Sequence, residues 1–588
     1  MNSAYLPTTR EEMHERGWDA LDIILVSGDS YIDSPYIGVS VIGRVLENAG
    51  FRVGIIAQPE ANSPGDITRL GEPELFWGVT GGSVDSMVAN YTASRRKRRS
   101  DDYTPGGINN RRPDRAAIVY ANLIRAHFKD TSPIVLGGIE ASLRRVAHYD
   151  FWSDALRRSI LFDAKADYLL YGMAEASVLE LAKALKDEKQ INQTRGLCFI
   201  SHDIPKGFLE IPSFEEVSAD NYAFIRMFHA FYQNNDPVSA KGIVQAHGDR
   251  FLVHNPPAEY LSEAALDEVY GLPYTYHQHP YYERQGKVKA LDTIRFSINS
   301  HRGCYGECNF CSIAVHEGRT VRWRSEASIL REAETLTRLP GFKGYILDVG
   351  GPTANMYGFE CSIKLDKGAC QDKRCIYPQV CPALKPNHQR QTGLLRKLRE
   401  IPGIKKVFVG SGLRYDLILA DEKHGREYLR ELAGHHVSGQ LKVAPEHSQA
   451  KVLEKMGKNP KESLLEFKQA FDEFSLEAGK KQYLTYYLIA GHPGCTEQDM
   501  RELKKFTAKQ LKISPEQVQI YTPLPSTYSA LMYHTGLDPF TLEPLFVEKD
   551  QSRKERQKAI LTEKHRKKAA PRSYMPSRRK PASKKRST

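Results

Sequence analysis

The sequence has few cysteines and no long apolar run. Nine of its 588 residues are cysteine, too few for a small disulfide-stabilised scaffold. No stretch approaches the roughly 18–20 apolar residues that a membrane helix needs, so we expect no membrane span. The first residues are polar and partly acidic, unlike a secretory signal. These features predict a cytoplasmic protein with reduced thiols, in which clustered cysteines indicate metal or redox chemistry.

Basic charge is present, but it is confined to one end of the chain. The formal net charge is +12. Residues 551–588 hold 15 Lys and Arg against Glu555 and Glu563, which is +13, so the rest of the chain sums to −1. Residues 549–588 are predicted to be a disordered basic tail, since the sequence after Arg572 lacks Val, Ile and Leu. The tail either contacts RNA, the ribosome or a membrane surface, or serves only solubility.

Residues 1–200 are predicted to form a Rossmann-like, doubly wound domain. Apolar strands such as residues 21–27 and 51–57 alternate with segments of helical periodicity. This alternation is typical of a parallel sheet that binds ligands at the carboxyl ends of its strands. The charged loop at residues 95–115 is expected to be a solvated insertion, with an anion-binding loop as the alternative. Residues 201–291 are interpreted as a connector.

Residues 292–548 are predicted to form a second α/β domain. Six strand-and-helix steps follow one another, fewer than the eight of a closed barrel, which favours an open, partial (β/α)6 barrel. Function in such folds lies on the loops that follow the strands. A cysteine-rich insertion at residues 360–382 interrupts the series.

The loop after the first of these strands carries Cys304, Cys308 and Cys311. Gly303 and Gly306 argue against a helix that would place the three thiols on one buried face. A closed zinc site normally has four protein ligands, and a four-iron cluster normally has four cysteines. Three cysteines would leave one iron of such a cluster free to bind another molecule. The loop is therefore the predicted metal site.

This spacing, C-x3-C-x2-C with Phe310 before the last cysteine, resembles the signature of radical S-adenosylmethionine (SAM) enzymes. Gly350-Gly351-Pro352 ends the second strand and is similar to the glycine motif that approaches the methionine amino group of SAM. Residues 491–494 (GHPG) and 520–527 (IYTPLPST) resemble later motifs of the methylthiotransferase and cobalamin-binding branches. Over its whole length the chain resembles the YgiQ-like proteins of that superfamily.

The resemblance implies a [4Fe-4S] cluster on the three cysteines, with SAM chelated by the fourth iron and Gly350 and Gly351 beside it. It also implies an enzyme that cleaves SAM reductively to start radical chemistry, with a reductant such as flavodoxin or ferredoxin as partner. The substrate stays open, and methylation or methylthiolation of RNA, protein or a small molecule are all candidates. The groups expected at the barrel mouth are Arg414, Glu446, His447 and Tyr521.

Four further cysteines follow the Gly-Gly-Pro turn, so seven of the nine lie within 78 residues. They are Cys361, Cys370, Cys375 and Cys381. Their spacing is irregular for zinc, whose sites usually contain C-x2-C pairs, but a polar loop between them would let four thiolates converge. A metal is favoured, with a second iron–sulfur cluster ahead of zinc, and free thiols or a redox disulfide are the alternatives. Cys198 and Cys495 are predicted to be packing residues.

The N-terminal domain resembles the cobalamin-binding domain of many radical SAM enzymes. The cobalamin fingerprint D-x-H-x-x-G aligns with Asp33 and Gly38, but Pro35 replaces the histidine and has no ligand atom. Cobalamin is therefore possible but not favoured over a substrate-binding or vestigial domain. The alternative function, from another class, is a non-catalytic, zinc- or cluster-stabilised nucleic-acid-binding protein that uses the basic tail.

Overall fold

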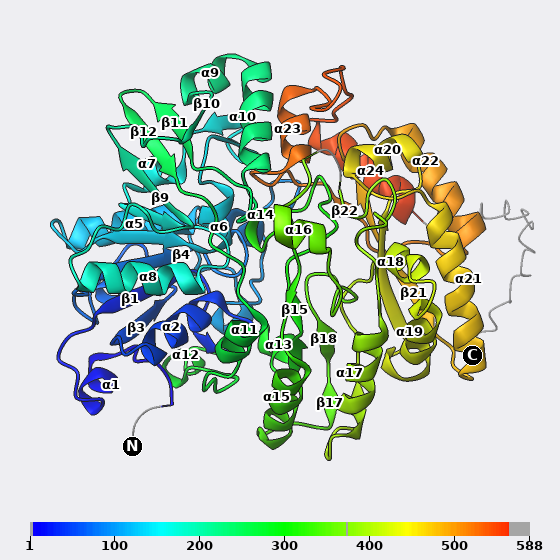
Figure 1. Cartoon of the computed structure of the whole chain (residues 1–588), viewed down its shortest axis with the longest axis horizontal. Coiled ribbons are helices and arrows are strands. Elements are labelled where there is room, and N and C mark those ends of the chain that lie inside the picture. Colours follow the sequence, from blue (N-terminus) through cyan, green and yellow to red (C-terminus); the bar gives the residue numbers. More distant parts are fainter. Residues whose placement is uncertain (1–3, 372–373, 564–588) are drawn as a thin grey trace, which may run out of the picture.

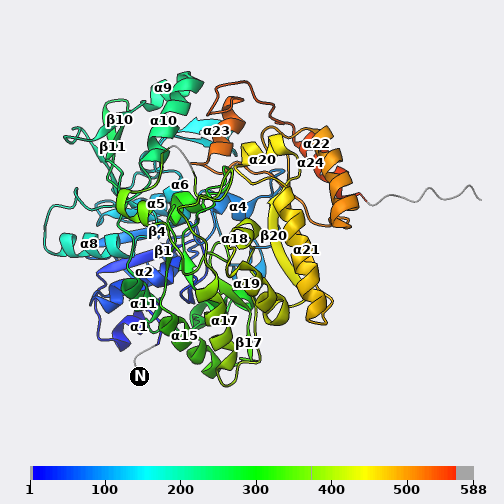
Figure 2. The ribbon, with the colours of Figure 1, turned by 45° about the vertical axis from the view of Figure 1, so that its right-hand side comes forward.

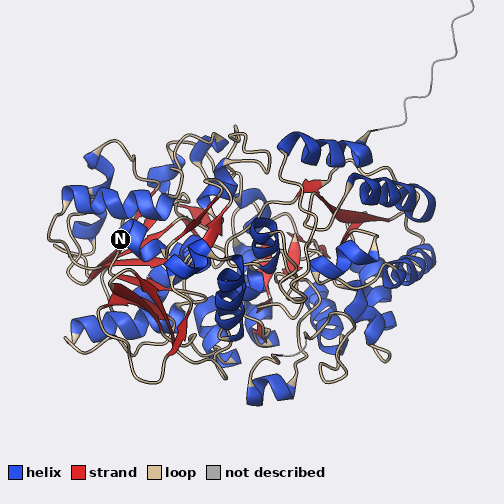
Figure 3. Ribbon diagram, turned by 90° about the horizontal axis from the view of Figure 1, so that it is seen from above, coloured by secondary structure: helices blue, strands red, loops and turns tan. Residues whose placement is uncertain are grey.

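Two α/β domains lie side by side in the chain (Figure 1). The computed structural model describes residues 4–371 and 374–563. Helices flank the strands of both domains (Figure 3). Among the described residues, no helix has both the length and the apolar character needed to cross a membrane. The predicted mixed α/β class is confirmed.

The first domain is built on a sheet of nine strands in the order β10-β11-β12-β9-β8-β5-β4-β1-β3. At one end of the sheet, the five neighbouring strands β8, β5, β4, β1 and β3 pair in parallel, as the repeated strand-and-helix pattern predicts. The nine are β1 (Ile23–Ser27), β3 (Val53–Ala57), β4 (Phe76–Thr80), β5 (Ile134–Gly137), β8 (Tyr168–Leu170), β9 (Leu197–Ser201), β10 (Leu209–Ile211), β11 (Ile243–His247) and β12 (Arg250–His254).

Both faces of this sheet are covered, because alternate residues of a strand point to opposite sides. Ile23 and Leu25 of β1 belong to one apolar core with helices α2 and α8, whereas Ile24 and Val26 belong to another with α5. The helices of this half are α1 (Arg10–Glu15), α2 (Gly38–Asn48), α3 (Pro64–Ile67), α4 (Ser86–Asn90), α5 (Ala116–His127), α6 (Gly138–Leu143), α7 (Ile160–Ala164), α8 (Glu175–Lys186), α9 (Phe214–Ala219), α10 (Asn221–Gln233), α11 (Glu263–Tyr270), α12 (Pro280–Glu283) and α13 (Leu291–Ile294).

The predicted boundary at residue 200 falls inside this sheet. Strands β10, β11 and β12 come from residues 201–291, the segment interpreted as a connector, and extend the sheet beyond β9. They join it partly by antiparallel pairing, β9 with β12 and β12 with β11. This segment is therefore part of the first domain. Its helices α11 to α13 lead into the second.

The second domain is an open barrel of six parallel strand positions. The first strand, β14, pairs with β18. The next pairs are β17 with β19, β20 with β21, and β21 with β22. A parallel bridge from Leu413 to Val443 joins the third position to the fourth. Among the described residues the first and last strands do not pair, which confirms a partial barrel. The strands are β14 (Ser297–Asn299), β17 (Tyr345–Ile346), β18 (Asp348–Gly350), β19 (Lys406–Val407), β20 (Gln440–Glu446), β21 (Tyr483–Ala490) and β22 (Gln519–Ile520).

Helices follow these strands in the predicted order, and three further pairs of short strands lie outside the nine-stranded sheet and the barrel. The helices are α14 (Ile313–His316), α15 (Glu326–Arg338), α16 (Ser362–Lys367), α17 (Gln389–Glu400), α18 (Tyr415–Ala420), α19 (Gly425–Glu431), α20 (Ala450–Met456), α21 (Glu462–Glu477), α22 (Glu497–Phe506), α23 (Tyr528–Thr535) and α24 (Gln551–Thr562). In these pairs, β2 (Ile32–Asp33) lies against β13 (His277–Gln278), β6 (His148–Asp150) against β7 (Ala155–Arg157), and β15 (His301–Arg302) against β16 (Arg322–Trp323).

Helix α24 corrects the predicted start of the tail. It lies beside α22 (Figures 1 and 2) and buries Lys554, Gln557 and Leu561. Gln557 accepts a hydrogen bond from the amide of Gly491 at 2.9 Å and donates one to the carbonyl of Cys495 at 3.2 Å. The segment from residue 549 is therefore in part a folded piece of the barrel. The remainder of the predicted tail, residues 564–588, lies outside the described residues.

Candidate active site between the two domains

The cysteine loop, residues 303–312, is an irregular segment between β15 and α14, at the carboxyl end of β14. Gly303 has a φ of +82°, and a Cβ there would lie 2.4 Å from the carbonyl oxygen of Thr320, so only glycine fits. Cys304 is buried, and Cys308 and Cys311 are half-buried. The loop is not helical, as its glycines predict, and all three cysteines line one cavity.

Polar groups lie beside the thiols of Cys304 and Cys308. The amide of Gly306 donates to Cys304 Sγ at 3.3 Å, and the Thr353 hydroxyl lies 3.6 Å from the same sulfur. A guanidinium nitrogen of Arg414 lies 3.6 Å from Cys308 Sγ. Burial raises the pKa values of Cys304 and Cys311 above the usual range of a thiol. A bound metal would supply positive charge that favours the ionised form of these sulfurs.

Arg414 is fixed in place beside the cysteines. Its Nε lies 3.0 Å from a carboxylate oxygen of Asp416, and its amide donates to Asn355 Oδ1 at 2.8 Å. A Cβ at Gly306 would lie 3.2 Å from both Cys304 Sγ and Arg414 Nη1. Gly306 thus packs closely between the Cys304 sulfur and the guanidinium, and a larger residue would push them apart. Three thiols, one of them beside a fixed cation, are a donor set that fits an iron–sulfur cluster with one iron left for another ligand.

The cavity beside the cysteines occupies about 590 Å³ inside the barrel. Of the groups predicted at the barrel mouth, Arg414 and Glu446 line it. Burial raises the pKa of the Glu446 carboxyl, and Lys458 lies 3.8 Å from it. His447 and Tyr521 are buried and are not among the residues that line the cavity. For these two groups the expectation is wrong, because their side chains point into the protein core.

His447 and Tyr521 instead support the far side of the barrel. His447 Nε2 lies 3.7 Å from the thiol of Cys495. The Tyr521 ring packs against His492, with 5.0 Å between the ring centroids. Cys495 and Cys198 are both fully buried, as expected of packing residues.

The two glycines of the Gly-Gly-Pro turn have different surroundings. The carbonyl of Gly350 accepts hydrogen bonds from the Ser300 amide at 2.7 Å and the Ser300 hydroxyl at 3.1 Å. A Cβ at Gly351 would lie 2.6 Å from the carbonyl oxygen of His301. Glycine is thus required at position 351 because the turn packs closely on the chain before the cysteine loop. Gly351 and Pro352 line a second cavity, whereas Gly350 does not border either cavity.

This second cavity, of about 490 Å³, lies between the two domains. One wall is the carboxyl edge of the nine-stranded sheet, where open-sheet proteins bind ligands. The glycines at that edge that line the cavity include Gly82, Gly137, Gly138 and Gly172. The opposite wall comes from the barrel and includes Asn299, Arg302 and Gly351. A ligand here would contact both domains.

The two cavities adjoin. Five residues line both of them, one from the first domain and four from the barrel. They are Tyr36, Ile313, Asp348, Pro352 and Ser411. Asp348 is held by the amides of Gly410 and Ser411, at 2.7 Å and 3.2 Å from its Oδ1. A molecule in the interdomain cavity would therefore lie next to the space that the cysteines border.

Polar groups also line the interdomain cavity. Arg302 forms a buried ion pair with Glu175 and donates to the Tyr270 hydroxyl at 3.0 Å. Within the described residues, Glu175 Oε2 and Ser83 Oγ are buried and have no hydrogen-bond partner. Buried polar atoms are normally paired, so these two are available to a ligand. The motifs predict neither residue, since each reaches the cavity only through the fold.

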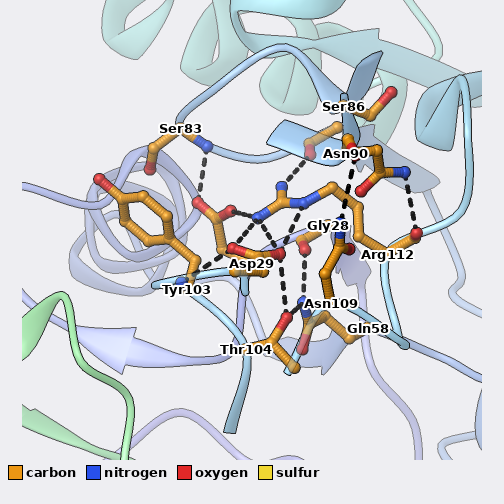
Figure 4. Close-up of polar contacts among 12 residues, drawn as sticks. Gly28, Asp29, Gln58, Ser83, Ser86, Asn90, Tyr103, Thr104, Asn109 and Arg112 are labelled. Atoms are coloured by element: carbon orange, nitrogen blue, oxygen red, sulfur yellow. Dashed lines mark hydrogen bonds and ion pairs between the residues drawn. The ribbon is translucent and has the colours of Figure 1, made fainter. Parts of the chain in front are cut away.

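The floor of this cavity includes Asp29, which Arg112 holds in place (Figure 4). Arg112 Nη2 lies 2.8 Å from Asp29 Oδ1, and its Nε lies 3.1 Å from an oxygen of Asp101. Figure 4 also shows the Ser83 amide directed at Asp29, a contact of 2.6 Å. Arg112, Asp101 and Thr104 are all buried. In the loop at residues 95–115, residues 95–100 are exposed as expected of a solvated insertion, whereas the buried Asp101, Thr104 and Arg112 fold its later part beneath the cavity.

The residues of the cobalamin fingerprint are divided between the core and this cavity. Asp33 is buried and pairs with Arg44 at 2.5 Å, and it accepts from Ser40 Oγ at 2.8 Å. Pro35, at the position of the cobalt-ligating histidine, lines the interdomain cavity, as does Gly38. The wall facing the barrel at this position therefore offers no side-chain ligand atom from residue 35.

Comparison with known proteins places the chain in a superfamily. Two family models match it in succession, "Radical SAM N-terminal" over residues 5–297 and "Radical SAM superfamily" over residues 298–507. Two solved structures of low identity also match. One is the radical SAM methyltransferase TsrM from Kitasatospora setae with cobalamin and a [4Fe-4S] cluster bound (16% identity, TM-score 0.49, 87% of this chain and 78% of that one). The other is the cobalamin-dependent radical SAM enzyme OxsB with aqua-cobalamin bound (12% identity, TM-score 0.49, 91% and 58%).

The chain is a radical SAM enzyme, and membership of this class implies a [4Fe-4S] cluster and SAM. The non-catalytic alternative therefore does not hold. A UPF0313 protein of Fusobacterium nucleatum is 55% identical, with 95% of this chain and 99% of the relative aligned. One from Thermotoga maritima is 50% identical, with 93% and 96% aligned. The chain belongs to the UPF0313 family, which comprises the YgiQ-like proteins.

Proposed function

We propose that Cys304, Cys308 and Cys311 hold a [4Fe-4S] cluster that binds SAM in the barrel cavity, and that the substrate occupies the interdomain cavity. The observation that carries this proposal is the common wall of the two cavities, with the three thiols on one side of it. When bound and reduced, such a cluster supplies the electron that cleaves a carbon–sulfur bond of SAM and starts radical chemistry.

The residues around the cysteines have distinct roles in this proposal. Arg414 stabilises the negative charge of the cluster thiolates, because its guanidinium lies 3.6 Å from Cys308 Sγ and is fixed by Asp416. The buried Glu446 and Lys458 lie on the same cavity wall and can hold the polar ends of SAM. Gly351 keeps the Gly-Gly-Pro turn close to the cysteine loop, and Gly350 supports it through Ser300.

The interdomain cavity favours a substrate with an apolar body that also carries polar groups. Its walls include Leu25, Phe76 and Val135, while Glu175 and Ser83 offer free acceptor or donor atoms. A small molecule or a protruding side chain fits this description, and methylation and methylthiolation remain the candidate reactions. Cobalamin is the alternative occupant. We do not favour it, because residue 35 is proline and Asp33 is paired with Arg44.

The test is SAM cleavage by the anaerobically reconstituted full chain. With a chemical reductant, or with flavodoxin or ferredoxin as the partner, the protein should form 5′-deoxyadenosine and methionine. Replacing any one of Cys304, Cys308 or Cys311 with Ala should abolish this, because no other side chain on the loop supplies a thiolate. The control Cys198→Ala removes a buried thiol of the other domain and should retain cleavage.

Two results would contradict the proposal. One is a full cluster whose electron paramagnetic resonance (EPR) spectrum does not change when SAM is added. The other is cleavage that persists in the single-cysteine variants. Cobalamin is tested separately by its visible absorption after anaerobic growth with the vitamin. Its retention in stoichiometric amount would replace substrate with cobalamin as the occupant of the interdomain cavity.

A further inference from the structure

A second group of thiols surrounds a small cavity of about 40 Å³ in the insertion. Its lining includes Lys364 and Arg374 together with all four cysteines of the segment. These are Cys361, Cys370, Cys375 and Cys381. We propose that this cavity is the binding site of a second iron–sulfur cluster, ligated by the four thiolates. The proposal goes beyond SAM cleavage and does not depend on it.

Hydrogen bonds of the backbone bring the cysteines together, although they span 21 residues of sequence. The amide of Cys381 donates to the carbonyl of Cys375 at 2.8 Å, which closes the last part of the segment. The carbonyl of Cys361 accepts from the amide of Lys364 at 3.1 Å as α16 begins. Arg319 donates to the carbonyl of Cys370 at 3.2 Å. Convergence of four thiols is therefore a property of the folded insertion.

The size of the cavity selects a small inorganic group. A single water needs about 10–15 Å³ of such space, so the cavity has room for several atoms. Organic cofactors and drug-sized ligands occupy pockets of roughly 300 Å³ or more. The cavity volume lies between these two values. It suits a metal centre that is bound directly by the cysteines of the cavity wall.

The charge along the cavity wall favours thiolates. Lys364 is buried, and its ammonium lies 3.6 Å from Cys375 Sγ. It shares the carboxylate of Glu307 with Arg319, and Arg374 donates to the Glu307 carbonyl at 2.9 Å. Three cations thus converge where ion pairs provide one carboxylate. Four thiolates on a metal core carry net negative charge and would offset the excess, whereas four neutral thiols would not.

An iron–sulfur cluster fits better than zinc. In a four-thiolate zinc site, Zn–S bonds of about 2.3 Å hold the sulfurs within about 4 Å of one another. Among the described residues, no three Cys, His or carboxylate groups are close enough to share a single ion, either in the insertion or in the Cys304 loop. A cluster spreads its thiolates over separate iron atoms and so accepts a wider spacing. The insertion also lacks the C-x2-C pairs of zinc sites.

The insertion contacts the first cysteine loop directly. Glu307, which pairs with Lys364 and Arg319, precedes Cys308 in that loop. Arg374 donates to Asn309 Oδ1 at 2.6 Å, on the other side of Cys308. Cys304 and Cys361 belong to one small apolar core. The proposed cluster would therefore lie directly behind the loop that holds the first one.

The experiment measures metal content and spectra of the full chain, reconstituted anaerobically with iron and sulfide. The wild type should contain about eight iron atoms per chain, for two four-iron clusters. A variant with Cys361, Cys370, Cys375 and Cys381 all replaced by Ala should retain about four, and its remaining EPR signal should still shift with SAM. The converse variant, with Cys304, Cys308 and Cys311 replaced, should also retain about four, with a signal that SAM does not shift.

The converse variant keeps the test decisive if the fourfold variant does not fold. Loss of all iron from the converse variant would overturn the proposal. Zinc at about one atom per chain, lost in the fourfold variant but kept in the converse variant, would also overturn it. Wild-type iron of about four, unchanged by the fourfold replacement, would also overturn it. If the fourfold variant loses iron and the converse variant loses none, the result would contradict the proposed SAM site but would still support a cluster in the insertion. Cys198→Ala is the matched control and should keep all the iron.

Discussion

Helix α24 should be required for the stability of the barrel, although the charge of its sequence is that of a tail. We compare two truncations, one ending at Glu563 and one ending at Asp550. The first removes only residues 564–588. The second also removes α24, with the buried side chains of Gln557 and Leu561. The two proteins differ only in α24, since neither contains residues 564–588.

The magnitude follows from the contacts of these two residues. Removing a buried leucine side chain such as that of Leu561 costs about 2–5 kcal/mol. Each hydrogen bond of Gln557 contributes about 1 kcal/mol, and the buried amide of Gly491 left without a partner costs about 1–3 kcal/mol. The total is on the order of 5 kcal/mol, against a typical stability of about 5–15 kcal/mol for a folded protein.

Thermal unfolding followed by circular dichroism measures the difference. The chain ending at Glu563 should have the same melting temperature as the full-length protein. The chain ending at Asp550 should melt well below it or fail to stay in solution, and Leu561→Ala alone should lower the midpoint by roughly 5–15 °C. The matched control is Lys558→Ala, on the same helix but outside its buried residues. Equal melting temperatures for the two truncations would show that α24 does not stabilise the barrel.

Two further predictions concern the same end of the chain. Burial lowers the pKa of Lys554 from its ordinary value of 10.5 to about 7, so between these values the folded chain binds fewer protons than the unfolded one and its stability should rise with pH, by about 1.4 kcal/mol per pH unit. Lys554→Met should remove this dependence of stability on pH and should be more stable than the wild type at pH 6. Denaturant titrations from pH 6 to 9 give the unfolding free energy at each pH, and the same change with pH in both proteins would contradict the prediction. Residues 564–588 carry 11 Lys and Arg and no Asp or Glu, so any binding to RNA or ribosomes should weaken steeply with salt and vanish in the chain ending at Glu563. Binding that survives the truncation would place the partner site on the folded body.

The periodic elements of both domains could be predicted from the sequence, because burial of a continuous apolar segment leaves a local pattern. Strands β1 and β21 are examples, with five and eight residues. Strands β10 to β12 could not, since β10 has only three residues, and β11 and β12 carry Gln, His or Arg within or beside their few apolar residues. Helix α24 was missed because its buried face includes Lys554 and Gln557, which are residue types that normally face solvent.

Some residues of the candidate site could likewise be predicted from the sequence, and others could not. The three cysteines lie within eight residues, so their common location is visible in the sequence, and the structure places them on one cavity. Arg414 and Glu446 were predicted as residues after strands, and the same rule failed for His447 and Tyr521, because it does not fix where a side chain points. Glu175 and Arg302 are 127 residues apart. A pair at that separation leaves no local pattern.

The bond from Gln557 to the Gly491 turn has a consequence for biosynthesis. The turn that ends β21 obtains its last hydrogen-bond partner from a helix near the carboxyl end of the chain. During synthesis the earlier strands can fold as they emerge, but this wall of the barrel is incomplete until residue 557 has left the ribosome. The turn that ends β21 should therefore reach its final hydrogen bonding only after α24 has been translated. Products that stop before α24 should leave the buried amide of Gly491 without a partner, a defect by which quality control could recognise them.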